Sequence, residues 1–186
     1  MGKREGGAGV TAASSGWRHV GRDRPPFAVE PGPGQESVWD YPRPPRLEPD
    51  ARHVVVRAGA TVLADTTRAI RVLETGSPPT FYLPPDDVRR ECLTAAPGTS
   101  MCEWKGRASY WTVVTPEGRW EHAGWSYLDP VPAFAAVRGY VSFYPGRVEC
   151  TVEGEIVRPQ PGGFYGGWIT REIVGPWKGE PGTGAW

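Results

Sequence analysis

The chain has 186 residues, which suits one domain with tails. Its 21 basic and 21 acidic residues give a formal net charge of zero, and this balance excludes a basic field that would attract nucleic acid or an anionic membrane surface. The 25 glycines and 21 prolines predict short strands joined by many turns.

The three cysteines, Cys92, Cys102 and Cys150, form no paired motif. An odd number of cysteines without a secretory signal favours a reduced, cytoplasmic protein. No stretch of the sequence is long and apolar enough to cross a bilayer, so we expect no membrane partner.

Two segments precede the expected domain. Residues 1–35 are rich in glycine, serine, arginine and proline and are predicted to be a disordered leader. Residues 36–51 form an arm whose prolines exclude a helix. Trp39 and Tyr41 are expected to anchor this arm on the domain, although Trp39 could instead be a partner-binding motif in a free tail.

A single antiparallel β domain is expected over residues 52–158. Its first half is rich in β-branched residues, which predict a three-stranded meander followed by a short strand. These strands are expected at 53–57, 60–65, 68–74 and 80–83.

The same region contains the only predicted helix of more than one turn, over residues 84–91, and a short helical piece is expected around residues 133–137. Pro85 fits the first turn of a helix, and Asp86 and Asp87 oppose the positive end of its dipole.

Residues 101–127 hold four of the nine tryptophans and alternate with a period of two, which predicts a β-hairpin. The strands are expected at 108–115 and 119–127, joined by Pro116–Gly118. Both faces of this hairpin carry large aromatic side chains. One face is therefore expected to lie on the core, and the other on core, a loop or a ligand.

The predicted register of this hairpin places Trp111 opposite Ala123. Residues 93–99 before it are expected to form a loop. A second hairpin is expected after it, with strands at 139–144 and 147–153.

The C-terminal tail, residues 159–186, is rich in glycine and proline but also carries large hydrophobic side chains. Such a tail is expected to pack on the domain or on a second copy of the chain, which would give a homodimer.

Four motifs occur in an order and spacing that resemble the domain of unknown function 427 family of bacteria and fungi. They are VLETGSPPTFYLPPDDV from Val72, CEWKGRASYWTV from Cys102, AGWSYLDPVP from Ala123 and GYVSFYPGRVE from Gly139. Two flanking segments resemble the long actinobacterial form of this family. They are ESVWDYPRPPR from Glu36 and FYGGWITREIVGPWKGEPGTGAW from Phe164.

The resemblance implies a mainly β, Mss4-like fold with one short helix and extended N- and C-terminal arms. It implies no settled activity. A nucleotidyltransferase label is attached to the family, but the sequence has no phosphate-cradling loop before a helix and no paired-carboxylate metal motif. Relatives of this fold that bind zinc use two Cys-x-x-Cys pairs, which are absent here, so no metal and no cofactor are expected.

Cys102 and Lys105 are the sharpest candidates for chemistry. They lie three residues apart in a bend before a strand, where the lysine could activate the thiol as a nucleophile. Alternatively, Cys102 is a small buried hydrophobe beside a lysine whose stem packs on apolar surface. Glu74 follows an apolar strand and could be a general base, or else a surface residue or a partner for Arg71 or Lys105.

Five aromatic residues are candidates for the wall of a ligand pocket. Their rings would offer flat apolar faces with polar groups at the rim, although an aromatic core would also explain them. They are Tyr82, Tyr110, Trp125, Tyr127 and Tyr144.

These observations predict a small-molecule-binding β domain whose aromatic pocket holds a pair formed by Glu74 and Lys105. An enzyme would use Cys102 or Glu74, with Lys105 stabilising a developing negative charge. The alternative is a non-catalytic protein-interaction module that uses the aromatic arm and tail. Convergence of the candidate residues on one concave site would favour the ligand-binding hypothesis.

Overall fold

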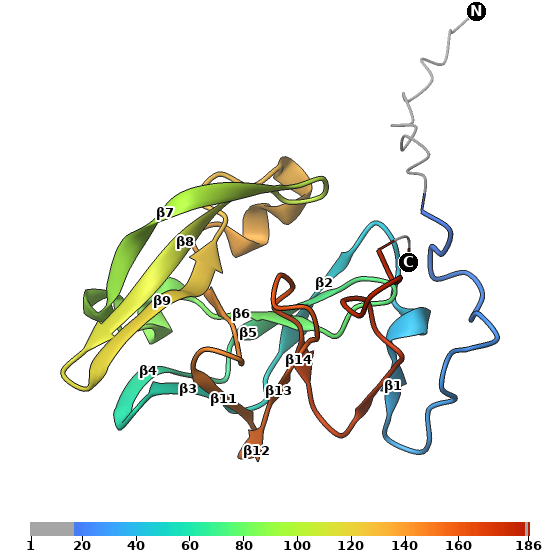
Figure 1. Ribbon diagram of the computed structural model, residues 1–186, viewed down its shortest axis with the longest axis horizontal. Helices are drawn as coiled ribbons and strands as arrows, with labels where there is room; N and C mark the ends of the chain where they lie inside the picture. Colours follow the sequence, from blue (N-terminus) through green and yellow to red (C-terminus); the bar gives the residue numbers. More distant parts are fainter. Residues whose placement is uncertain (1–16, 185) are drawn as a thin grey trace, which may run out of the picture.

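Short, mostly antiparallel β-strands make up most of the protein, as the sequence predicts (Figure 1). This computed structural model describes residues 17–184 and 186. None of the helices within this part of the chain is long and apolar enough to cross a membrane.

The described residues form three larger sheets. The first has the order β10-β9-β8-β7, with the bounds Ser142–Phe143, Gly118–Ser126, Gly106–Thr115 and Leu93–Cys102. The second has the order β12-β11-β3-β4, with the bounds Glu155–Ile156, Glu149–Val152, Val54–Ala58 and Thr61–Thr66. The third has the order β2-β5-β6, with the bounds Arg46–Asp50, Ala69–Leu73 and Thr80–Tyr82.

Two small strand pairs and four 3₁₀ turns complete the described elements. The pairs join β1 (Glu36–Ser37) to β15 (Ile173–Val174) and β13 (Arg158–Pro159) to β14 (Trp168–Ile169). The turns are η1 (Val38–Asp40), η2 (Pro85–Asp87), η3 (Arg90–Cys92) and η4 (Pro132–Val137).

The predicted continuous helix at 84–91 is wrong. Only the separate turns η2 and η3 form there, because the chain between them is extended. Val88 is buried and makes a β-bridge with Ala64, and the Arg89 N–H donates to the Leu63 carbonyl at 2.8 Å. Burying Val88 against β4 therefore outweighs the local helix-start signal.

The predicted meander is also wrong beyond its first two strands. Strands β3 and β4 pair with each other, but β5 pairs with β2 and β6. The cause lies in Arg71 of β5, a buried residue whose guanidinium contacts Glu48 and Asp50 of β2 as well as Glu36. These carboxylates compensate the buried charge only if β5 lies beside β2.

The central hairpin forms between β8 and β9, but its register differs from the prediction by one residue. Gly118 already pairs with Thr115, so the turn is shorter than expected, and Trp111 lies opposite Gly124. A bulge at His122, where φ is 49°, shifts the pairing between the two halves of the hairpin.

Two further connections differ from the prediction. The expected loop at 93–99 is part of strand β7, whose pairing with β8 is interrupted beside Pro97 and Gly98. The expected hairpin at 139–153 does not form, because β10 pairs with β9 whereas β11 pairs with β3 and β12. Its two halves thus belong to different sheets.

The C-terminal tail contributes to the main hydrophobic core. Trp168 is fully buried, stacks on Phe81 with ring centroids 4.8 Å apart, and donates its indole N–H to the Phe143 carbonyl at 3.0 Å. In Figure 1 the tail (dark orange to red) runs back beside β5 and β6 and ends near the start of the arm. The tail is thus held by its own domain.

The N-terminal arm is anchored in a smaller apolar cluster. Trp39 is 1% exposed, which excludes its alternative interpretation as a motif in a free tail, and its indole N–H donates to the Pro176 carbonyl at 2.8 Å. Phe27 stacks on Trp186 beside it.

The predicted disorder of the leader is wrong for residues 17–35, which pack on the rest of the chain: the Trp17 indole N–H donates to Glu103 at 2.7 Å, and the Val29 N–H donates to the Gly175 carbonyl at 2.8 Å. Residues 1–16 of the leader lie outside the described residues.

Candidate functional site

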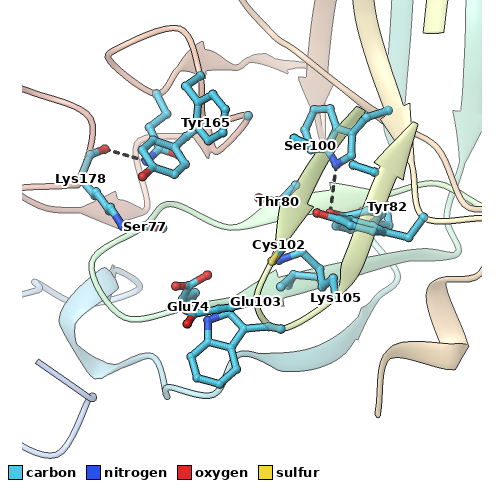
Figure 2. Close-up of a pocket in the computed structure, with 18 of the residues that line it drawn as sticks. Glu74, Ser77, Thr80, Tyr82, Ser100, Cys102, Glu103, Lys105, Tyr165 and Lys178 are labelled. Atoms are coloured by element: carbon cyan, nitrogen blue, oxygen red, sulfur yellow. Dashed lines mark hydrogen bonds between the residues drawn. The ribbon is translucent and has the colours of Figure 1, made fainter. Parts of the chain in front are cut away.

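A cavity of about 350 Å³ lies where the third sheet, the β7–β8 turn and the C-terminal tail meet (Figure 2). This volume is at the lower end of the range for small-molecule sites. The cavity wall includes all eight residues that the sequence proposes for the site. They are Glu74, Tyr82, Cys102, Lys105, Tyr110, Trp125, Tyr127 and Tyr144. The structure brings them together, and their roles stay predictions.

The alternation of side chains along two strands explains how these residues reach the cavity. On β6, Thr80 and Tyr82 face the cavity, whereas Phe81 between them faces the core. At the end of β9, Trp125 and Tyr127 line the cavity on either side of Ser126. One face of each strand therefore supplies the wall, and the other face supplies stability.

The aromatic part of the wall is fixed by direct contacts. The Trp125 indole N–H donates to the Tyr82 hydroxyl at 3.2 Å, and its ring centroid lies 4.4 Å from that of Tyr144. The Tyr110 hydroxyl donates to the Ser100 hydroxyl at 2.7 Å. Burial raises the pKa of both Tyr82 and Tyr127, so these phenols stay protonated and neutral at physiological pH.

Lys105 enters the cavity from the tight β7–β8 turn. Its neighbour Gly106 has a φ of +95°, a left-handed conformation that favours glycine. Lys105 is only 8% exposed, and its ammonium lies 5.8 Å from the ring centroids of both Tyr127 and Phe134. Burial disfavours the charged form, but neighbouring groups that include the Glu74 carboxylate outweigh it, and the pKa of Lys105 lies above its ordinary value.

The predicted direct pair between Glu74 and Lys105 does not form. The Glu74 carboxylate lies 3.4 Å from a terminal nitrogen of Arg43, and no ion pair reaches Lys105 in the part of the chain that the structure describes. Arg43 has a fully buried side chain, which also donates to the carbonyls of His19 and Thr75. A buried guanidinium needs a counter-charge, and Arg43 therefore takes the carboxylate.

Cys102 lies half-buried in the cavity wall, close enough to Lys105 and Tyr127 to affect the pKa of both. The other two cysteines, Cys92 and Cys150, are buried in the main core. Cys102 is therefore the cysteine in a position to meet a ligand.

Lys178 is a cavity residue that the sequence interpretation missed. It is 6% exposed, and its ammonium lies 4.1 Å from the ring centroid of Trp17 and 5.1 Å from that of Tyr165. Gln160 holds this segment in place by donating to the Lys178 carbonyl at 2.6 Å. One signal was available: Trp-Lys-Gly occurs at both 104–106 and 177–179, and each copy places its lysine on the cavity wall.

Trp17 closes the cavity beside Lys178. Its indole N–H donates to Glu103 at 2.7 Å, and its ring lies 4.4 Å from the centre of the Arg43 guanidinium. Trp17 of the predicted leader and the tail after the domain thus supply part of the wall, which no motif within the domain predicts.

The ionisable groups of the cavity suit binding and charge stabilisation better than metal coordination. Among the described residues, no cluster of three or more histidine, cysteine, aspartate or glutamate side chains could hold a metal ion. Two ammonium groups, several phenols and indoles, and one thiol can instead contact an organic molecule through charge, ring stacking and hydrogen bonds.

Comparison with known proteins identifies the family. A model described as a domain of unknown function (DUF427) matches residues 46–154, more than half of the chain, whereas no curated protein matches it. The matched range contains the central hairpin and the site residues from Glu74 to Tyr144, but not Trp17, Arg43 or Lys178. The Mss4-like fold and the actinobacterial form stay predictions. The chain therefore belongs to the domain of unknown function 427 family.

Proposed function

We propose that this protein binds a small molecule with a flat, largely apolar body in the cavity between the third sheet and the β7–β8 turn. The observation that carries the proposal is the convergence of aromatic side chains and two buried lysines on one hollow of about 350 Å³. A hydrophobic core alone would not favour buried ammonium groups without carboxylate partners.

The energetics of Lys105 support a ligand. Contact with aromatic rings stabilises a desolvated ammonium by about 0.5–2 kcal/mol. Burial of the charge costs more than the rings contribute, and the pKa of Lys105 still lies above its ordinary value because neighbouring groups, Glu74 among them, favour the charged form. The ammonium is therefore charged but has no carboxylate in direct contact within the described part of the chain, and a ligand anion would supply that contact.

The alternative, a protein-interaction module, is less well supported. It requires the aromatic residues of the arm and tail to face a partner, but Trp39 and Trp168 are buried within their own chain. Among the large tail side chains, Phe164 remains 64% exposed, and it also lines the cavity. A homodimer through the tail stays a prediction.

Catalysis would require a reactive group at the wall, and Cys102 is placed for that role. Lys105 beside it could stabilise negative charge on the thiol or on a substrate. Glu74 is less suited to act as a general base, because Arg43 already engages its carboxylate.

Screening by thermal shift tests the proposal. The protein would be heated with each member of a library of small metabolites, and hits would be measured by calorimetry. A ligand at 100 times its dissociation constant stabilises the fold by about 2.7 kcal/mol, so it should raise the melting temperature by roughly 5–10 °C.

Two matched variants make the screen specific for the cavity. Thr80→Phe fills the cavity from β6 and should remove the shift, whereas Thr94→Phe on the exposed face of β7 should leave it intact. The proposal fails if no compound binds, or if hits bind the Thr80→Phe variant as tightly as the wild type.

A further inference from the structure

We infer that the ligand of this cavity is an aromatic acid, whose carboxylate or phosphate group is held by the ammonium group of Lys105 or of Lys178. This inference rests on the proposed small-molecule function and adds the chemical class of the ligand. It follows from which charges around the cavity already have partners.

Both carboxylates that line the cavity are engaged. Glu74 pairs with Arg43 at 3.4 Å, and Glu103 accepts the indole N–H of Trp17 at 2.7 Å. Arg43 therefore compensates the charge of Glu74, whereas Glu103 is exposed to solvent and bonds only a neutral indole. Within the described wall, the buried charges that lack an ionic partner are positive.

Both lysines that line the cavity lack a direct carboxylate partner among the described residues. Lys105 and Lys178 are 8% and 6% exposed, and neither has a carboxylate oxygen within 4.0 Å in the described part of the chain. Aromatic rings hold each ammonium, at 5.8 Å for Lys105 and at 4.1 and 5.1 Å for Lys178. Ring faces attract a cation but leave its N–H donors free for ligand oxygens.

A third unpaired donor belongs to a residue of the cavity wall. The indole N–H of Trp104, another residue of the cavity wall, is buried and has no hydrogen-bond partner among the described residues. An indole nitrogen can only donate, so the group that satisfies Trp104 must be an acceptor. The oxygen atoms of a carboxylate or a phosphate ester are acceptors.

The two lysines also limit the shape of the ligand. Figure 2 shows Lys178 and Lys105 on opposite sides of the cavity, with Glu74 between them in this view. The ring centroid of Trp17 lies 4.1 Å from the Lys178 ammonium, so an aromatic ring is compatible with this charge at close range. A compact ring with an acidic group at its edge fits both features.

Matched fragment pairs test the inference. Aryl carboxylates and aryl phosphates of one or two rings would each be paired with a neutral analogue, the primary amide or the alcohol. Binding to the full chain would be followed by ligand-observed NMR and quantified by calorimetry. We expect acids to bind at least tenfold more tightly than their neutral analogues, and the ratio between carboxylates and phosphates identifies the acid.

Substitution of each lysine assigns the contact. Lys178→Met or Lys105→Met should weaken binding of the best acid at least tenfold, and the arginine variant at that position should retain most of the affinity because it keeps the charge. Arg107→Met, on the exposed part of β8, serves as the matched loss of a positive charge and should change nothing. The melting temperature of each variant would confirm that it folds.

The outcomes separate this inference from the proposed function. Suppose that neutral analogues bind as tightly as acids, that both lysine variants still bind these compounds, and that Thr80→Phe blocks binding. The cavity then binds small molecules, but the inference of an acidic ligand is wrong. If no acid binds the wild type at millimolar concentration, the inference is overturned regardless of what else binds.

Discussion

Arg43 and Glu74 form an ion pair, with 3.4 Å between guanidinium nitrogen and carboxylate oxygen, that joins the N-terminal arm to the edge of the cavity. The Arg43 side chain is fully buried, whereas the Glu74 side chain is 22% exposed. Burial lowers the pKa of Arg43, and the charge of Glu74 opposes that effect. The arm is therefore attached by a contact that also shapes the site.

Removing this carboxylate should destabilise the fold. Glu74→Gln leaves the buried Arg43 without its counter-charge, and we expect a loss of about 1–2 kcal/mol in the free energy of unfolding, less than for a fully buried pair because Glu74 is partly solvated. Urea denaturation measures the loss. Glu121→Gln removes an exposed partner of Arg119 and should cost less than about 0.5 kcal/mol. Equal losses in the two variants would contradict this account.

Stability should fall in acid through the carboxylates around Arg71. Burial opposes ionisation of Asp50 and Glu48, but hydrogen bonds from Arg52 to Asp50 and from Arg71 to Glu48 outweigh it and lower the pKa of both carboxyls. Groups with a lowered pKa stabilise the fold above their unfolded values of about 3.9 and 4.3, and this stabilisation is lost as the pH falls further.

The urea midpoint should therefore stay nearly constant from pH 7 to about pH 5 and drop below about pH 4. Asp50→Asn should make that drop shallower, whereas Asp129→Asn, at a position 90% exposed in its side chain, should not. Parallel acid profiles for the wild type and Asp50→Asn would show that the contact contributes nothing.

Two aromatic residues of the tail should differ sharply in their effect on stability. Trp168→Ala removes a fully buried ring that stacks on Phe81, and we expect a loss of about 3–5 kcal/mol. Phe164→Ala changes a side chain that is 64% exposed and should cost less than about 1 kcal/mol. Thermal denaturation distinguishes them, and a small loss for Trp168→Ala would mean that the tail does not belong to the core.

Alkylation should select one cysteine. Cys102 faces the cavity, whereas burial raises the pKa of the Cys150 thiol and shields it from reagent. Iodoacetamide should therefore label Cys102 at least tenfold faster than Cys150, as followed by peptide mass spectrometry. Thr80→Phe should slow labelling of Cys102, and Thr94→Phe should not. Labelling of Cys150 at a similar rate would contradict the assigned positions.

The sequence predicts the β class because alternation along β3, β4 and the β8–β9 hairpin is a local signal. Pairing between distant strands is not local. The place of β5 beside β2 depends on Arg71 and its carboxylates, which lie up to 35 residues away. Strand β7 cannot be recognised from the sequence because Pro97 and Gly98, which ordinarily indicate a loop, occupy an irregularity within the strand.

The residues of the site also differ in whether a local signal in the sequence identifies them. Glu74, Lys105 and Trp125 were identifiable because a charged residue or a bulky aromatic stands out within its own motif. The sequence does not identify Arg43, which supplies the counter-charge of Glu74, or Lys178, which supplies the second ammonium. Each is brought to the site only by the packing of the arm or the tail.

Part of the cavity wall thus comes from outside the range that the family model matches. The family-matched range 46–154 holds most of the hydrophobic core and most of the wall, whereas Trp17 and Lys178 of the wall come from outside it. Substitutions at these two positions can change which molecule fits the cavity without altering a strand of the three main sheets. Ligand preference in proteins of this architecture can therefore diverge through their flanking segments while the central domain stays the same.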